Sequence, residues 1–454
     1  MSGRRHRRHP PPEFHLGRAN VTGSVHRLRN RSPLRRPTRL RPDRGRARGP
    51  PRHAAQVRGV RRAHPGRDGR RNLQHADPEV PQARLLRDED QGVLRAARRA
   101  QGTAGRQGQR HPRVLHRQRA ARAAGDAGVV DLITLLGGGI GAARLWCGIA
   151  EIAEEPLTFV VNTGDDLWLH GLRICPDLDT VLYALSGRQD TERGWGMADE
   201  TFRCMSELGG LGEQTWFQLG DRDLATHLLR TGMLKSGRTL SEATSRLAAG
   251  MGVRHRVLPM TDAEVTTFVR VATGETMHYQ EFLVPRGARD TVEAANYRGI
   301  ADARPAAGVL EAIERSRLVI LGPSNPVASV GPVLALPGVR DALRTTAAQV
   351  IAVTPAVSGV PITDPGEAGR ARSRAALLAQ RGLRHSAAGV ASMYRDICDL
   401  FVVDEADAGE TVEITAMGIR TATMPTLVNT PQDGVSLARQ VLEISADAGA
   451  LAVT

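Results

Sequence analysis

The chain has 454 residues, and its formal net charge of +14 is unevenly spread along the sequence. Residues 1–130 hold 33 Arg, no Lys and 9 acidic residues, a net charge of +24; the remaining residues hold 29 basic and 39 acidic side chains, a net charge of −10. This acidic body excludes any inference of nucleic-acid binding from the overall charge, because only the first 130 residues are basic.

Residues 1–130 form an Arg-rich leader that we predict to be disordered. Runs such as Arg35–Pro50 have few aromatic residues and no sustained periodicity, so they cannot bury enough apolar surface to offset chain entropy. Three interpretations are open. The first is a nucleic-acid-binding arm, but such an arm would carry base-stacking aromatic residues, and these runs have few. The second is a transit peptide, which would be Arg-rich but also Ser-rich and poor in acidic residues. We favour a start codon misassigned upstream in a GC-rich gene, with the natural start near Val129 or Val130, and we do not expect a nucleic-acid partner.

The body, residues 131–454, is long enough for one α/β domain with insertions. Its cysteines include no Cys-x-x-Cys pair, which predicts reduced thiols and not a disulfide framework or a zinc site. No apolar run approaches the roughly 18–20 residues that span a bilayer, and the N-terminus has no signal-peptide apolar segment. We therefore expect a cytoplasmic protein that does not engage a membrane.

Short, continuous apolar runs recur along the body, which is typical of parallel strands buried on both faces. They are Leu132–Leu136, Leu157–Val161, Leu318–Leu321, Val350–Val353 and Leu400–Val403. Predicted helices lie at Ala142–Glu154, Thr180–Leu185, Asp199–Leu208, Leu224–Thr231 and Ser241–Ala249. Thr239–Glu242 is a capping box for the last of these helices. The alternation predicts an α/β fold, a Rossmann-like, doubly wound and mainly parallel sheet with ligand sites at the carboxyl ends of its strands.

Val265–Val284 has a different pattern. Its residues alternate, turn at Thr273–Glu275 and alternate again, which predicts an antiparallel hairpin. We place it in a helical and hairpin insertion at about residues 190–310 that covers the ligand edge of the sheet. His278 and Glu281 on this hairpin either touch substrate or form a cross-strand pair.

Gly137–Ala142, with the sequence Gly-Gly-Gly-Ile-Gly-Ala, follows the first predicted strand and opens a helix. Glycines let the backbone approach a phosphate, and a helix N-terminus supplies N–H groups and partial positive charge. The spacing also fits a dinucleotide-binding turn, but that reading expects an acidic residue about 20 positions further on. Here the second strand ends in Asn162. Tight strand–helix packing is the other explanation of the glycines.

The segment Asn162–Thr180 is dense in carboxylates and contains Asp165, Asp166, Asp177 and Asp179. These groups cannot all be buried without a cation, because their mutual repulsion would raise their pKa values. Hard oxygen ligands beside a phosphate-binding turn predict Mg²⁺-assisted chemistry on a diphosphate. The alternative for Asp177 or Asp179 alone is capping of the helix that starts near Thr180.

Two further motifs are candidates for the site. Leu219–Leu229 begins a helix with Asp221 as its expected cap, and its Arg222 and His227 either face a ligand or have a structural role. Gly322–Pro326 follows a buried strand, and its prolines fix a turn that leaves Ser324 and Asn325 free to bond a base or a phosphate. Thr354–Gly359 repeats this arrangement after the next strand.

These motifs, with His278–Phe282 and Val330–Gly338, resemble the 2-phospho-L-lactate transferase family. The resemblance runs from about Asp131 to the C-terminus with the motifs in the same order, and residues 1–130 have no counterpart. It implies a Mg²⁺-dependent reaction of coenzyme F420 biosynthesis. A guanosine-diphospho donor carrying lactate or enolpyruvate gives its phospho-acyl unit to the ribityl hydroxyl of a deazaflavin precursor, and GMP leaves. Phosphoryl transfer requires the positioning and charge neutralisation that the motifs predict.

The resemblance also implies roles for single residues. Asp179 would lie at the ribityl chain and the metal, with Asp165 as a second metal ligand and Asp166 as a catalytic carboxylate. The diphosphate and nucleotide would be bound by Gly137, Gly138, Gly139, Gly141, Asn162, Ser324 and Asn325. Some family members carry Lys in place of Gln218, so Arg144 or Arg222 is expected to supply positive charge instead. A homodimer is a family-level expectation, and the sequence does not decide between the two donors.

A nucleotide-sugar-binding regulatory protein is the second hypothesis. A distant branch of the superfamily shares the glycine turn and an Asp-Asp pair without being a transferase. That branch has a Gly- and Ser-rich loop after the pair, where this chain has Leu167–His170 and then Pro176–Asp179. The sequence therefore favours the transferase.

Overall fold

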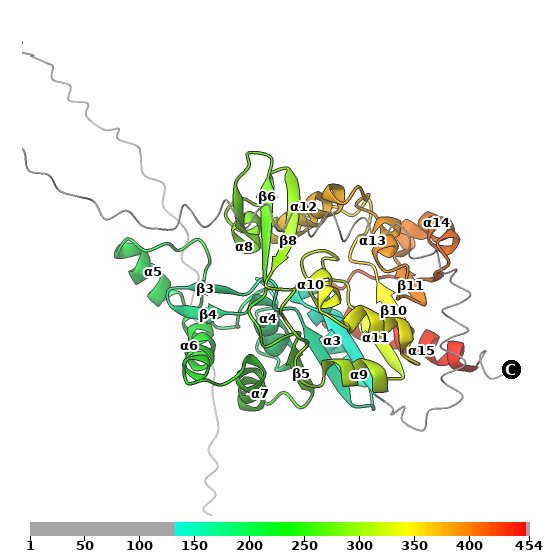
Figure 1. Ribbon diagram of the computed structural model, residues 1–454, viewed down its shortest axis with the longest axis horizontal. Helices are drawn as coiled ribbons and strands as arrows, with labels where there is room; N and C mark the ends of the chain where they lie inside the picture. Colours follow the sequence, from blue (N-terminus) through cyan, green and yellow to red (C-terminus); the bar gives the residue numbers. More distant parts are fainter. Residues whose placement is uncertain (1–131, 451–454) are drawn as a thin grey trace, which may run out of the picture. The chain divides into compact units, whose positions relative to one another are not determined.

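The computed structural model describes residues 132–450; the predicted disordered leader, residues 1–130, and its proposed start near Val129 lie outside the described residues. The described chain is built around a seven-stranded sheet in the order β12-β11-β10-β9-β1-β2-β5, with all neighbours parallel (Figure 1). Its strands are β1 (Ile133–Gly137), β2 (Leu157–Val161), β5 (Arg256–Pro259), β9 (Leu318–Leu321), β10 (Gln349–Val353), β11 (Leu400–Val403) and β12 (Arg420–Thr423). The predicted parallel sheet is confirmed.

The five strands inside the sheet are those that the apolar runs predict, within one residue at each end. The edge strands β5 and β12 are not predicted. β5 begins with the exposed Arg256 and ends with Pro259, and β12 contains no buried residue. An edge strand has one neighbour and mixes polar with apolar residues, so it lacks the continuous apolar run of a central strand.

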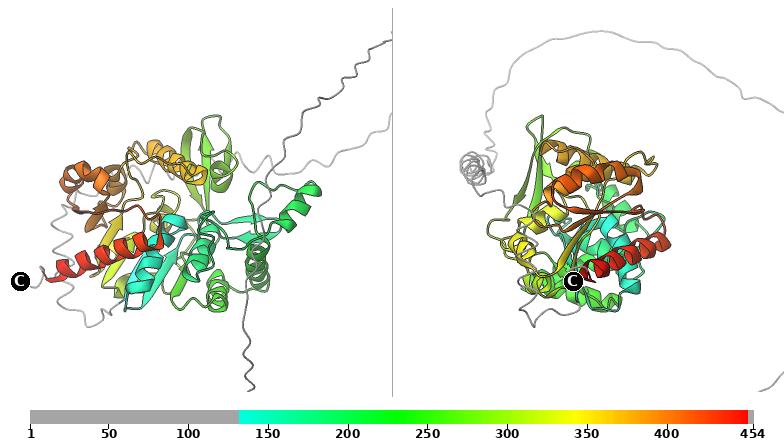
Figure 2. Two further views of the ribbon diagram at one scale, coloured as in Figure 1. Left: turned by 180° about the vertical axis from the view of Figure 1, so that it is seen from behind. Right: turned by 90° about the vertical axis from the view of Figure 1, so that its right-hand side faces the viewer.

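Successive residues of the strands point to opposite faces of the sheet, and helices cover both faces. On one face Leu136 and Val319 share a hydrophobic cluster with α9 (Val309–Arg315), α10 (Val330–Ala335), α11 (Val339–Thr345), α13 (Ala387–Met393) and α14 (Thr411–Ala416). On the other face Leu135 and Ile320 share a cluster with α3 (Gly139–Ile152), α4 (Pro176–Leu185), α7 (Leu240–Met251) and α15 (Pro431–Ala450). Figure 2 shows α15 running beside α3. The sheet is therefore doubly wound, as predicted.

The register of the central strands brings the predicted motifs to one edge of the sheet. Gly137 pairs with Val161, so the glycine turn and Asn162 leave β1 and β2 at the same level. The Asn162 N–H donates to the Gly137 carbonyl at 2.8 Å, and the Gly322 N–H donates to the Leu136 carbonyl at 3.0 Å. The chain segments after β2, β1 and β9 thus start side by side at the carboxyl edge, where doubly wound sheets bind ligands.

Two smaller units extend from this edge. One contains an antiparallel pair, β3 (Leu167–Leu169) and β4 (Leu172–Ile174), with α5 (Arg203–Gly210) and α6 (Asp221–Lys235). The other is a three-stranded sheet in the order β7-β6-β8, formed by β6 (Thr266–Val271), β7 (Thr276–His278) and β8 (Val292–Arg298), with α8 (Tyr279–Leu283) and α12 (Pro365–Gln380). A 3-10 helix, η1 (Glu405–Glu410), precedes α14.

The predicted hairpin is correct at its turn and wrong in its second strand. β7 has three residues, and the chain then enters α8, because His278 and Glu281 form a capping box that starts a helix. The third strand, β8, is not predicted. The range expected as one insertion, residues 190–310, also contains β5 of the central sheet, so the insertion is not continuous.

Two expected helix caps are wrong, and the helix predicted at Asp199–Leu208 is α5, which begins at Arg203. α4 starts at Pro176, so Asp177 and Asp179 lie in its first turn and neither caps it. Asp221 is the first residue of α6, and its carboxylate accepts hydrogen bonds from the backbone of Arg203 and Cys204 at the start of α5. The capping box of Thr239 and Glu242 on α7 is confirmed.

The cysteines Cys147, Cys175, Cys204 and Cys398 are free thiols. Among the described helices, none is both long enough and apolar enough to cross a membrane.

Candidate functional site

The glycine turn between β1 and α3 leaves little space for side chains. A Cβ at Gly138 would lie 2.2 Å from Asp177 Oδ2, and a Cβ at Gly141 would lie 2.4 Å from the Pro323 carbonyl oxygen. Ser324 closes the turn, since its hydroxyl donates to the Gly138 carbonyl at 2.9 Å and accepts from the Gly138 N–H at 3.3 Å. Close packing therefore accounts for the glycines at positions 138 and 141.

The turn also exposes a helix terminus that can bind an anion. Gly139, with a positive φ of 73°, starts α3, whose first turn contains no acidic residue and whose N-terminus has no side-chain cap. The unpaired N–H groups and the partial positive charge of a 14-residue helix are available there for a phosphate. The structure thus supports packing at some glycines and an anion-binding terminus at the same turn.

The end of β2 holds a group of side chains that we call the amide-linked cluster: Asn162, Asp165, Asp177 and Gln280. Asn162 Nδ2 donates to Asp165 Oδ1 at 3.1 Å and to Asp177 Oδ2 at 2.9 Å. Gln280 Nε2, from α8, donates to Asp165 Oδ2 at 2.7 Å. Every member is buried, and the cluster contains two carboxylates and no cationic side chain.

This cluster brings two carboxyl groups together without a cationic side chain to balance them. Burial raises the pKa of Asp165 well above its ordinary value, and the neighbouring carboxylates of Asp177 and Asp166 raise it further. Burial also raises the pKa of Asp177 to about 6, against the hydrogen bond from Asn162. Amide donors orient a carboxylate without neutralising it, so the charge stays available to a cation.

Asp166 lies next to this cluster. Its Oδ2 is 3.4 Å from the Arg173 guanidinium, and its buried Oδ1 has no hydrogen-bond partner among the described residues. Burial raises the pKa of Asp166 to about 7, although Arg173 opposes this shift. His278 accepts from the Gln280 N–H through Nδ1, so its Nε2 carries the ring proton and donates to the Asp166 carbonyl at 3.2 Å.

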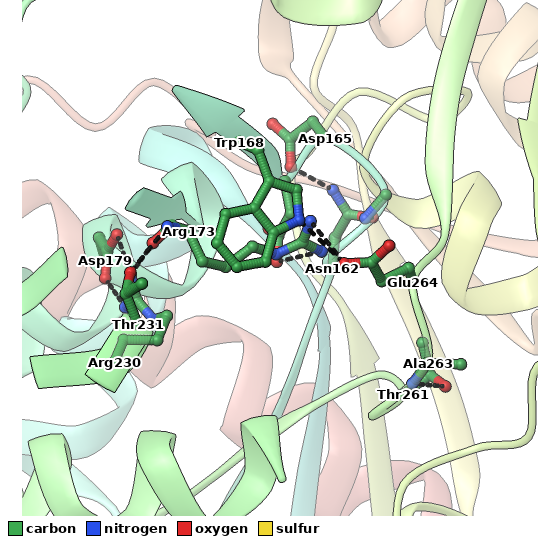
Figure 3. A network of polar contacts seen from close by, with 12 residues as sticks. Asn162, Asp165, Trp168, Arg173, Asp179, Arg230, Thr231, Thr261, Ala263 and Glu264 are labelled. Carbon is green, nitrogen blue, oxygen red and sulfur yellow. Dashed lines mark hydrogen bonds and ion pairs between the residues drawn. The ribbon is translucent and has the colours of Figure 1, made fainter. Parts of the chain in front are cut away.

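Asp179 belongs to a second group, which we call the guanidinium-linked cluster: Asp179 and Tyr183 of α4 with Asp223, His227 and Arg230 of α6. Arg230 is fully buried and contacts both oxygens of Asp179, one of them at 3.1 Å (Figure 3). His227 Nδ1 lies 3.6 Å from Asp179 Oδ2, and its Nε2 lies 3.2 Å from Asp223 Oδ1. The Tyr183 hydroxyl donates to Asp223. Here a guanidinium balances the charge of Asp179.

A cavity of about 390 Å³ opens beside Asp166. Its walls include the aromatic side chains of Trp168, Trp216 and Phe268. Trp168 is 47% exposed and donates to Glu264 at 2.9 Å, and the Arg173 guanidinium lies 5.8 Å from its ring (Figure 3). A cavity with aromatic walls and the carboxylates of Asp166, Glu264 and Glu281 in its lining suits a flat, polar ring system.

Several predicted residues lie away from the carboxylates or are used by the fold. Arg222 is exposed and donates to the Ala198 carbonyl at 2.6 Å, and Arg144 donates to the Val428 carbonyl at 3.0 Å. Asn325 Oδ1 accepts from two backbone N–H groups of its own turn. Gln218 donates to the Thr215 carbonyl at 2.7 Å. The carboxylates of Asp166 and Asp179 pair instead with Arg173 and Arg230, which the sequence analysis does not identify.

The donor atoms of the amide-linked cluster fit a hard divalent cation. Asp165 and Asp177 offer buried carboxylate oxygens, the type of ligand that Mg²⁺ prefers. Among the described residues, the ligand atoms of Asp179, Asp223 and His227 lie within 4.8 Å of one another and those of Asp165, Asp166 and Asp177 do not, but the Arg230 guanidinium already contacts Asp179 and would repel a cation. Asp165 and Asp179, predicted as joint ligands, face different partners.

Comparison with known proteins defines the family. The profile described as "2-phospho-L-lactate transferase CofD" matches residues 133–425. A "2-phospho-L-lactate transferase" from Methanosarcina acetivorans is 39% identical over 309 residues, 68% of this chain and 97% of that protein. A "Phosphoenolpyruvate transferase" from Streptomyces griseus is 41% identical over 319 residues, 69% of this chain and 98% of that protein.

The chain belongs to the CofD family of 2-phospho-L-lactate transferases, and it is a transferase. The family predicted from the sequence motifs is confirmed. A crystal structure of a upf0052 family protein from Bacillus halodurans also aligns over 69% of this chain and 98% of that protein, with a TM-score of 0.45 and 18% identity. At that distance the alignment carries no inference about function.

Proposed function

We propose that the chain catalyses Mg²⁺-dependent transfer of a phospholactyl or phosphoenolpyruvyl group from a guanosine-diphospho donor to the ribityl hydroxyl of a deazaflavin precursor, in coenzyme F420 biosynthesis. One observation carries this proposal. Buried carboxylates with unbalanced charge lie against the uncapped N-terminus of α3, since Asp177 Oδ2 would be 2.2 Å from a Cβ at Gly138. An anion-binding helix terminus beside a cation-binding cluster is suited to a metal-bound diphosphate.

The donor diphosphate would lie over the turn at Gly137–Gly139, where backbone N–H groups face the carboxyl edge of the sheet. Ser324 keeps this turn in shape through its two contacts with Gly138. The free amide of Asn325 is at the same edge, since only its Oδ1 is used within its own turn. These groups bind and orient the donor without changing its chemistry.

Asp165 and Asp177 would hold the Mg²⁺. When bound, the cation would neutralise charge on the phosphate oxygens. Asn162 and Gln280 orient the two carboxylates by donating to three of their oxygens. The excess charge of these carboxylates is the physical reason to expect a cation here, because burying them together is otherwise unfavourable.

The deazaflavin ring would occupy the cavity of about 390 Å³, between the aromatic side chains of Trp168, Trp216 and Phe268. Asp166 lines this cavity and carries an unpartnered oxygen, so it is the candidate proton acceptor for the ribityl hydroxyl. A pKa of about 7 suits a base that works near neutral pH.

In the proposed reaction the ribityl oxygen attacks the phosphorus that carries the acyl group. A bond forms between that oxygen and phosphorus, the bond from phosphorus to the GMP oxygen breaks, and the hydroxyl proton passes to Asp166. The product is the phospho-acyl diester of the deazaflavin, and GMP leaves. Asp179, held by Arg230, would orient the ribityl chain.

The test is incubation of the protein with the deazaflavin, Mg²⁺ and each guanosine-diphospho donor in turn, with GMP release followed by chromatography. We expect GMP release that requires all three components. Comparison of kcat/KM for the lactyl and the enolpyruvyl donor identifies the preferred one. A protein that binds a nucleotide sugar but releases no GMP with either donor would support the alternative regulatory role and would contradict this proposal.

A further inference from the structure

The face of α6 that packs against α4 carries polar residues in place of apolar ones. Asp223, His227 and Arg230 stand at positions i, i+4 and i+7 and therefore share one face of the helix. All three are buried, and Arg230 is fully buried. Burial of an ionised side chain is costly unless it is paired, so this face requires an explanation beyond packing.

These residues form a closed chain of contacts with α4. Arg230 contacts both oxygens of Asp179, and Arg230 Nη1 lies 3.3 Å from His227 Nδ1. His227 Nε2 is 3.2 Å from Asp223 Oδ1, and Asp223 accepts from Tyr183, four residues after Asp179 on α4. Both ends of the chain thus return to the same helix.

The contacts favour one tautomer of His227. An Arg guanidinium can only donate, so His227 Nδ1 accepts from Arg230 and carries no proton. The ring proton is then on Nε2, the nitrogen that faces the Asp223 carboxylate. The imidazole lies between the Asp223 carboxylate and the Arg230 guanidinium and limits the directions that the guanidinium can take.

α6 also contacts the backbone of Arg173, the ion-pair partner of Asp166. Arg230 Nη1 donates to the Arg173 carbonyl at 3.4 Å, and the Thr231 hydroxyl accepts from the Arg173 N–H at 2.8 Å (Figure 3). Arg173 in turn lies 3.4 Å from Asp166. One helix face therefore fixes the orientation of Asp179 directly and the position of Asp166 through Arg173.

We propose that Arg230 and His227 are positioning residues for the transfer reaction, which orient the Asp179 carboxylate and the Arg173 backbone from one buried face of α6. This inference rests on the proposed function. Two N–H groups of a planar guanidinium define the plane of a carboxylate, and His227 defines the plane of the guanidinium. Displacing Asp179 by about 1 Å is expected to reduce kcat by on the order of 10²-fold.

Variants of His227 test whether its ring nitrogens orient Arg230 or whether the side chain only fills space. His227→Asn keeps a polar atom near the Nδ1 position, toward Arg230, whereas His227→Gln places its polar end near the Nε2 position, toward Asp223. We expect the Gln variant to lose kcat by about tenfold, the Asn variant to stay within about threefold of the wild type, and the acceptor KM to change little in either. Arg230→Lys keeps the charge and loses the two-point contact, and we expect the larger loss of about 10²-fold in kcat.

The matched control is Arg340→Lys on α11, where Arg340 makes a two-point contact with Asp396. Its kcat should equal that of the wild type. Rates are to be corrected for the folded fraction, measured by thermal unfolding. A purely structural role for the α6 face predicts lower melting temperatures with unchanged corrected kcat in the His227→Gln and Arg230→Lys proteins, and that result would overturn the inference.

Crystal structures of the His227→Asn and His227→Gln proteins test the inference without a measurement of kcat. We expect the Asp179 carboxylate to keep its orientation in the Asn variant and to rotate in the Gln variant. An unchanged Asp179 in the Gln variant would overturn the positioning role. Lack of GMP release by the wild type would count against the proposed function alone, and these structures would still decide the inference.

Discussion

The two carboxylate clusters at the edge of the sheet are built from the same residue type with opposite partners. In the amide-linked cluster, Asp165 and Asp177 receive hydrogen bonds from Asn162 and Gln280, which carry no charge. In the guanidinium-linked cluster, Asp179 faces Arg230. Both groups are buried, so the difference lies in charge balance and not in exposure.

This difference separates two functions that the sequence places in one motif. An amide orients a carboxylate and leaves its charge unbalanced, which suits a cation. A guanidinium orients a carboxylate and cancels its charge, which suits the orientation of a neutral hydroxyl. The comparison predicts that the same substitution, Asp to Asn, has opposite effects on stability in the two clusters.

Asp179→Asn should have the largest effect. It leaves the guanidinium of Arg230 buried without a counter-charge, and breaking a buried pair in this way costs on the order of 3–5 kcal/mol in the free energy of unfolding. Loss of the oriented carboxylate should reduce turnover by roughly 10²–10⁴-fold. Urea unfolding and the rate of GMP release measure the two effects separately.

The double variant Asp179→Asn with Arg230→Met sharpens this result. It removes the unpaired charge, so stability should recover toward that of the wild type while turnover stays low. Asp341→Asn, at an exposed position on α11, is the control for a loss of one carboxylate. If the double variant regained turnover along with stability, Asp179 would have no part in the reaction.

Asp177→Asn should have a smaller effect on stability and the opposite sign. With a chelator present at pH 8, removal of one of two repelling carboxylates should raise the free energy of unfolding by about 1–3 kcal/mol, because burial and repulsion oppose ionisation here. Turnover should nevertheless fall by about 10²-fold, since the cation loses a ligand. Equal or lower stability of the variant under these conditions would contradict the assignment of excess charge to this cluster.

Addition of Mg²⁺ tests whether Asp177 binds the cation. Wild-type protein and the Arg340→Lys control should gain melting temperature with rising Mg²⁺, as any ligand that binds only the folded state stabilises it. Asp177→Asn should lose most of that gain. A full Mg²⁺ response in Asp177→Asn would place the cation elsewhere.

The interior of the fold could be predicted because its strands are apolar on both faces. β9 and β11 match the predicted runs at every residue. The edge strands could not be predicted, since the pairing that stabilises β5 and β12 comes from one neighbour and leaves no continuous apolar run. The end of the hairpin was wrong because a capping box at His278 overrides the alternating pattern.

The candidate site was predictable where its residues are close in sequence. Asp165 and Asp177 come together through Asn162 at the end of β2, as the density of carboxylates indicates, whereas Asp179 faces Arg230. Their partners were not predictable from spacing, because Arg230 lies 51 residues from Asp179 and Gln280 lies 115 residues from Asp165. The i, i+4, i+7 repeat of polar residues from Asp223 on α6 was a usable signal, since such a repeat on a buried face requires partners.

Trp168→Ala tests the aromatic cavity beside the two clusters. Loss of one stacking side chain should raise the acceptor KM by about tenfold, since stacking of a base on an aromatic ring contributes roughly 1–3 kcal/mol. We expect kcat to remain within about threefold, because Trp168 contacts Glu264 and neither of the two clusters. Trp195→Ala is the control, as Trp195 packs against Arg193 and is not a wall of the cavity. Equal KM values for the two variants would remove the cavity from acceptor binding.

Asp396→Asn should have the smallest effect and lies outside both clusters. Burial raises the pKa of Asp396, but hydrogen bonds and charge from Arg340 and Arg344 outweigh burial and lower it below its ordinary value. A lowered pKa in the folded state stabilises the fold above the ordinary pKa of about 4, and that contribution is lost as the pH falls through the folded value. At pH 7 the variant should lose about 0.5–1 kcal/mol, because solvent screens this half-exposed group, and it should match the wild type in strong acid. We expect kcat to be unchanged, because Asp396 lies outside the proposed site. A stability difference that grew toward low pH would reverse the assigned sign.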